Sequence, residues 1–214
     1  TEIGKLFIRI HFGLIFNNLS GFAAYARPPG AFMEHRLKGL IEKNKTEIIK
    51  KWFEATIQTY APDTAQFYKG QKDQFANPVG NITAKGVEFL LDQLLNDFEP
   101  DAVKTYLDPI IRIRAVQNFT PSQATAFIFL LKTVLRDCLS DKLQDAALVL
   151  ELLAFESKID QLCLMAFDIY MTCKEKIYQI SANDMRSQAL KAFKRAGLIE
   201  DESPQPGKVK GLKH

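Results

Sequence analysis

Apolar residues recur every three or four positions along most of the chain, which places them on one face of successive α-helices. The pattern predicts an all-α fold with helices at about residues 37–60, 83–98, 101–118, 120–139, 144–180 and 183–196. Pro62 follows the first of these helices and Pro100 separates the second from the third. Residues 63–81 contain Gly70, Pro78 and Gly80, so this stretch is predicted to be mostly a connector.

The segment IIRIRAVQNFTPSQATAFIFLLK, residues 110–132, contains a helix-start signature. Thr120 can cap a helix, Pro121 suits the first helical position, and Gln123 can reach back to the cap amide. The segment is therefore predicted to form the end of one helix, a corner and the start of the next.

Two arginines lie in the apolar part of this segment. Arg112 lies one turn beyond Asp108, which predicts a surface ion pair. Arg114 falls on the buried face. In a first interpretation its guanidinium group reaches water or pairs with a carboxylate of the chain. In a second interpretation it contacts an anionic ligand or a partner's carboxylate. The second interpretation predicts a ligand site with these members: Arg114, Gln117, Phe119, Gln123 and Phe127.

The predicted helix at 144–180 would be roughly 55 Å long, longer than a domain of this size can cover by itself. Its apolar residues alternate spacings of four and three, the heptad pattern of helix-on-helix packing. A second stripe contains Val149, Leu153, Cys163, Phe167 and Tyr170. In one interpretation, one stripe packs on the core and the other packs on a partner's helix. In the other interpretation, the two form a single broad stripe that is buried inside one bundle. The first interpretation predicts a homodimer whose interface contains Leu148, Leu152, Phe155, Ile159 and Leu162.

The chain is expected to divide into an apolar N-terminal extension (residues 1–32), a globular domain (33–181), a tail helix (182–197) and a polar flexible tail (198–214). Met33 has the features of a natural chain start. Residues 5–26 are long enough to span a bilayer, but Arg9 and His11 would be costly to bury in lipid. This segment is therefore interpreted as a peripheral membrane contact, a contact with a neighbouring subunit, or an upstream extension.

Charge and cysteine content narrow the function further. The 28 basic and 25 acidic residues leave a formal net charge of +3 and are interspersed, which excludes the footprint of a nucleic-acid-binding protein. The three cysteines show no spacing typical of zinc or redox pairs, so they are expected to be reduced, buried thiols of a cytoplasmic protein.

The sequence offers little catalytic chemistry. The histidines are His11, His35 and His214, so residues 36–213 contain no partner for a nucleophilic Ser or Cys and no proximal haem ligand. Phosphate-binding glycine loops are also missing. We therefore expect no catalytic residues, no metal site, no cofactor and no enzymatic activity.

Three blocks of sequence together resemble a known family: KNKTEIIKKWFEATIQTYAP, FANPVG and the segment at 110–132. Over about residues 34–181 they resemble the N-terminal domain of RsbR-type RsbT co-antagonist proteins, in particular a stand-alone bacterial branch. The resemblance implies a globin-like helical bundle without haem that dimerises and serves as a sensor or protein-interaction module in stress signalling. Stressosome members of the family carry a C-terminal STAS domain, for which too few residues follow Ser181. Resemblance to stand-alone relatives in sulfate-reducing bacteria implies a membrane redox complex of sulfite reduction as partner.

Three functions stay open from the sequence. The first is a non-enzymatic sensory or regulatory domain that acts through dimerisation and protein contacts. The second is a globin-like protein that binds a small anionic or amphipathic ligand. The third is an accessory subunit of a membrane-associated anaerobic redox complex, which depends on residues 5–26. In FANPVG, Phe75 and Val79 are expected to insert into the core, and the turn either closes the bundle or forms a pocket rim.

Overall fold

The computed structural model describes residues 34–71, 73–96 and 98–198, and all regular structure in them is helical. The all-α prediction and the long C-terminal helix are confirmed. The elements are α3 (Glu34–Lys43), α4 (Lys45–Ile57), α5 (Pro62–Gly70), α6 (Pro78–Leu95), α7 (Pro100–Val116), α8 (Pro121–Cys138), a short 3-10 turn (Ser140–Lys142) and α9 (Ala146–Arg195).

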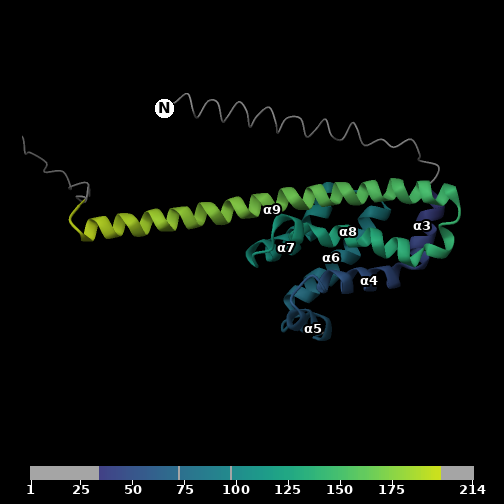
Figure 1. The fold of residues 1–214 in the computed structure, drawn as a ribbon, viewed down its shortest axis with the longest axis horizontal. Helices are drawn as coiled ribbons and strands as arrows, with labels where there is room; N and C mark the ends of the chain where they lie inside the picture. Colours follow the sequence, from purple (N-terminus) through teal and green to yellow (C-terminus); the bar gives the residue numbers. More distant parts are fainter. Residues whose placement is uncertain (1–33, 72, 97, 199–214) are drawn as a thin grey trace, which may run out of the picture.

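One long helix supports the rest of the bundle. Helix α9 packs against α7 and α8, α6 packs on α7, and α4 fits between α6 and α8. Figure 1 shows α9 running along one side of this bundle and continuing well beyond it. The core between these helices is built from fully buried side chains, among them Ile41, Trp52, Leu91, Leu107, Phe127 and Ile159.

The helix starts differ from the prediction in two places. The connector expected at residues 63–81 contains α5, because Pro62 occupies its first turn and Asp63 adds an acidic group where the helix dipole favours one. Helix α6 begins at Pro78, with Asn77 as its cap, rather than near residue 83. Sequence reasoning treated Pro78 only as a breaker, whereas proline is favoured at the first position of a helix.

Asn77 anchors the FANPVG turn from inside. Its side-chain oxygen accepts a hydrogen bond from the Gly80 amide, and its Nδ2 donates to the carbonyls of Tyr68 (2.8 Å) and Gln71 (2.9 Å). Gly80 is needed for this arrangement, since a Cβ there would overlap the Asn77 side chain. Phe75 is 87% exposed, so its expected insertion into the core is wrong. The buried amide of Asn77 joins α5 to α6 instead.

Helix α9 is continuous over 50 residues, about 75 Å. The separate tail helix expected at 182–197 is therefore wrong, and the boundary placed after Ser181 is not a structural break. The residues around Asn183 include no glycine or proline, so nothing there forces the helix to end. Ser181 and Asn183 are both exposed, where their weaker helix propensity costs little.

Several expectations fall outside the described residues. They are the membrane contact at 5–26, the chain start at Met33 and most of the polar tail at 198–214. Across residues 34–198, apart from 72 and 97, no helix combines the length and apolar character that crossing a bilayer requires.

Candidate functional site

The side chain of Arg114, near the end of α7, is 0% exposed. Its Nη2 donates to the Thr56 carbonyl (3.3 Å) and to Thr59 Oγ1 (3.0 Å), and its Nη1 donates to the Gln123 carbonyl (3.2 Å). The Thr56 carbonyl belongs to the last turn of α4, where the helix dipole favours a positive charge. Arg114 therefore ties together α4, α7 and the first turn of α8.

Three aromatic rings surround the guanidinium group. Its central carbon lies 4.9 Å from the ring centroid of Tyr60, 5.1 Å from that of Phe119 and 4.8 Å from that of Phe127. At these distances the negative faces of the rings attract a cation. We call Arg114 and these three rings the Arg114 cage.

The cage holds a charge without an acidic partner. Among the described residues, no ion pair includes Arg114, and its Nε is buried without a hydrogen-bond partner. Burial lowers the pKa of the Arg114 guanidinium, whereas the nearby Tyr60 raises it. An arginine keeps its charge at ordinary pH. Here neutral carbonyls, one hydroxyl and the faces of aromatic rings replace the water that would otherwise solvate that charge. A buried cation solvated in this way is the strongest electrostatic anomaly in the described part of the chain.

The cage is joined to the long helix by one hydrogen bond. The Tyr170 hydroxyl on α9 donates to the Phe119 carbonyl at 2.5 Å. Phe119 follows Asn118, which has a φ of 62°, a left-handed conformation that asparagine tolerates better than most residues. The corner between α7 and α8 is thus held on one side by Arg114 and on the other by Tyr170.

The predicted ligand residues come together only in part. Arg114, Phe119 and Phe127 meet in the cage, and Gln123 contributes its backbone carbonyl. The Gln123 side chain instead completes the capping box with Thr120, which confirms that prediction. Gln117 is exposed and is not a member of the cage.

The neighbouring arginine behaves as predicted. Arg112 pairs with Asp108 on the surface, one turn away on the same helix. The sequence did not identify Thr56, Thr59 and Tyr60 as partners of Arg114. These residues lie more than 50 positions earlier in the chain, and only the packing of α4 on α8 brings them close.

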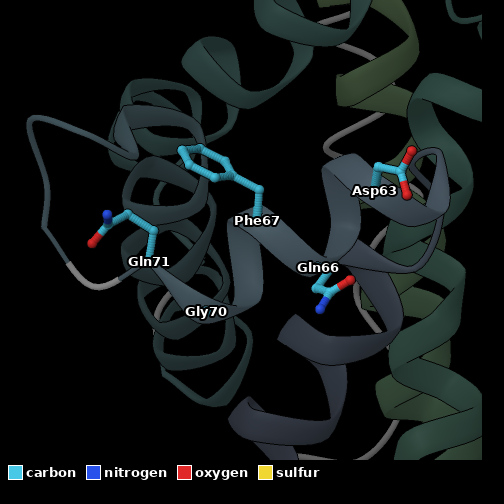
Figure 2. Close-up of a pocket in the computed structure, with 5 residues that line it drawn as sticks. All are labelled: Asp63, Gln66, Phe67, Gly70 and Gln71. Atoms are coloured by element: carbon cyan, nitrogen blue, oxygen red, sulfur yellow. The ribbon is translucent and has the colours of Figure 1, made fainter.

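One surface hollow lies apart from the cage, beside α5. It has a volume of about 490 Å³ and is lined by Asp63, Gln66, Phe67, Gly70 and Gln71, all in or beside α5. Figure 2 shows that the labelled side chains point in different directions along this helix and do not converge on one point. The residues of FANPVG do not line it, so the pocket-rim interpretation gains no support here.

The thiols face the core. Cys163 and Cys173 are buried and Cys138 is half-buried, each as a free thiol. Burial raises the pKa of both Cys163 and Cys173, which keeps them protonated and weakly nucleophilic. Within the described residues, no group of three His, Cys, Asp or Glu side chains is placed to hold a metal ion.

The pKa values predict how stability depends on alkaline pH. Burial raises the pKa of the Tyr60 hydroxyl above 10.0, with Arg114 opposing it in part, and burial raises the pKa of the Cys163 thiol above 9.0. An acid with a raised pKa in the folded state releases its proton first in the unfolded state. These two groups should therefore leave the free energy of unfolding unchanged near neutral pH and lower it as the pH rises above about 8.

Urea titrations from about pH 7 to about pH 10.5 would measure this fall. The Tyr60→Phe variant should show a shallower decline than the wild type, since one of the titrating groups is removed. An equal decline in both proteins would show that Tyr60 does not contribute.

Five residues of α9 were predicted to form a dimer interface: Leu148, Leu152, Phe155, Ile159 and Leu162. All five are buried in the chain's own core, so they cannot meet a partner directly and this assignment is corrected. They form the heptad seam along which α9 packs against the other helices of its own bundle. A heptad pattern in sequence does not distinguish a partner within the chain from one outside it.

The opposite face of α9 is apolar and exposed. Large side chains there are 43–67% exposed: Leu150, Leu153, Leu164, Phe167, Met171, Tyr178 and Met185. We call these seven residues the outer stripe. From Tyr178 to Leu198 every residue is exposed, and Figure 1 shows this part of α9 extending past the end of the bundle.

These features define an all-α domain that projects one long helix from a compact bundle. The chain belongs to the family of the RsbT co-antagonist protein rsbRD N-terminal domain, whose family model matches residues 46–185. The family is one of stress-signalling regulatory domains. The match ends within the projecting part of α9, so the family domain includes residues 178–185 of that projection.

A curated relative covers a smaller part of the chain. An uncharacterised protein of Archaeoglobus fulgidus is 29% identical over 105 residues, which is 48% of this chain and 66% of that protein. No solved structure matches the chain.

Proposed function

We propose that this protein is a non-enzymatic sensory or regulatory domain that works as a homodimer and passes its signal to another protein through α9. Its family supports a regulatory role, and the observation that carries the proposal is the projecting half of α9 with its exposed apolar side chains. A single helix of about 20 residues is only marginally stable alone in water, so a protein contact is its expected environment.

The bundle supplies a route by which a signal reaches α9. The Arg114 cage fixes the corner between α7 and α8, and Tyr170 hydrogen-bonds that corner from α9. A change at the corner would therefore alter the packing of α9. We also propose a cytoplasmic location, from the free thiols, and, from the resemblance, a membrane redox complex of sulfite reduction as the protein that receives the signal.

Native mass spectrometry of the whole chain tests this proposal. The expected species has twice the mass of the 24.3 kDa chain, because two copies associate. A purely monomeric protein at micromolar concentration would contradict the homodimer and would leave the regulatory role to contacts with other proteins.

Binding of a small anion is a second candidate function, favoured by the unpaired charge of Arg114. A carboxylate or other small oxyanion would satisfy the buried Nε, which has no partner among the described residues. The same mass spectra should then show added mass that is lost in Arg114→Gln and kept in Arg112→Gln. Equal masses before and after mild denaturation would count against a bound ligand.

A further inference from the structure

The outer stripe follows one position of a heptad repeat along α9, from Leu150 to Met185. Positions seven apart face the same side of a helix in a coiled coil, and they are occupied by Leu150, Ser157, Leu164, Met171, Tyr178 and Met185. Leu153 and Phe167 lie three residues after the first and third of these positions and widen the stripe. Ser157 is a polar member of this series, and Asp160, Lys174 and Ser181 also occupy positions three residues later. The apolar series is therefore continuous from Leu164 to Met185, which takes it from the bundle into the projecting end of α9.

We propose that the outer stripe is the surface on which a second copy of this chain docks, with α9 packed against α9. The inference rests on the proposed homodimer and assigns its interface. It replaces the inward seam, which the chain's own core already occupies.

The area of the stripe suits a dimer. Seven large side chains that are 43–67% exposed present roughly 800 Å² in all, about what each partner buries in a standard specific interface. Monomeric proteins rarely leave an apolar patch above about 600 Å² uncovered. The stripe therefore has about the apolar area that a partner chain covers in a dimer.

Two charged residues beside the stripe are held by contacts within the chain. Asp160 forms an ion pair with Lys132 on α8 at 2.6 Å. The Lys174 ammonium group lies 5.9 Å from the ring centroid of Tyr170, which belongs to the inward side. Both charges thus have contacts within the chain, and the apolar side chains between them remain available for contact with a partner.

A second copy fits this surface better than an unrelated protein. Heptad stripes pack best against a helix with the same repeat, and every copy carries such a helix of 50 residues. Pairing about a two-fold axis places the same patch on both sides, which is the commonest geometry of homo-oligomers. The alternative occupants are a foreign helix and a segment of this chain outside the described residues.

Size-exclusion chromatography with light scattering would test the assignment on the whole chain. Leu164→Glu and Met171→Glu place a charge in the stripe, so each should weaken dimerisation at least about tenfold. Thr172→Glu is the matched control, because it adds the same charge one position along, on an exposed part of α9 outside the stripe. It should leave the dimer intact.

Met185→Glu is a third stripe variant, chosen because it should not disturb folding of the bundle. Met185 lies in the part of α9 where every residue is exposed, so its replacement disturbs no contact of the bundle and should also yield monomers. A wild-type dimer that survives all three stripe substitutions would overturn the interface while leaving the homodimer standing. A monomeric wild type would refute the homodimer itself, and the outer stripe would then be covered by another occupant.

Discussion

Replacing Arg114 with alanine is expected to lower the free energy of unfolding by about 3–5 kcal/mol. The substitution removes three hydrogen bonds and leaves the buried carbonyl of Thr56 and the carbonyl of Gln123 without the guanidinium. It also opens a cavity between the rings of Tyr60 and Phe127. Urea unfolding followed by circular dichroism measures the loss.

Two further variants separate volume from charge. Arg114→Met keeps most of the volume and removes the buried charge, so its loss should be less than half that of the alanine variant. Arg112→Ala removes a surface pair on the same helix and should change stability by about 0.5 kcal/mol or less. If Arg114→Ala were as stable as the wild type, the cage would not hold the corner, and ligand contact would become the better explanation of Arg114.

Trp52→Ala should cost about 3–5 kcal/mol, since Trp52 is fully buried on α4. Its Nε1 donates to the Phe127 carbonyl on α8 at 2.8 Å, so the substitution loses both packing and a hydrogen bond between two helices. Trp52→Phe keeps much of the ring and loses the hydrogen bond, for a cost of about 1–2 kcal/mol. Thermal and urea unfolding of the two variants give the comparison.

Phe53 provides the control for Trp52. It lies on the same turn of α4 but is only half-buried, so Phe53→Ala should cost clearly less than Trp52→Ala. Equal losses at the two positions would show that the contact between α4 and α8 does not depend on the tryptophan. Phe127 links both predictions, because Arg114 contacts its ring and Trp52 its carbonyl.

The features that could be predicted from the sequence are local ones. Helical spacing located most of the helices, and the Thr120 capping box and the pair of Arg112 with Asp108 were both predicted from residues within one turn of each other. The burial of Arg114 also followed from its place on the apolar face of α7. In each case the determining contacts lie close together along the chain.

The features that were missed depend on tertiary contacts. Tyr60 joins the cage, and Thr56 accepts a hydrogen bond from Arg114, only because α4 packs beside α8, and no local pattern marks either residue. The start of α6 is different, because its signals are local: Asn77 caps the helix and Pro78 occupies its first turn, but Pro78 was interpreted as part of a connector. The heptad seam of α9 was found, but its assignment to a dimer was wrong, since the same pattern serves packing within one chain.

The central claim is that the outer stripe on the projecting half of α9 is covered by a second copy. Hydrogen–deuterium exchange of residues 178–195, at protein concentrations above and below the dissociation constant, tests it most directly. The account predicts slow exchange of these amides in the concentrated protein and fast exchange after dilution. Fast exchange of these amides in the concentrated protein, where light scattering shows a dimer, would contradict it.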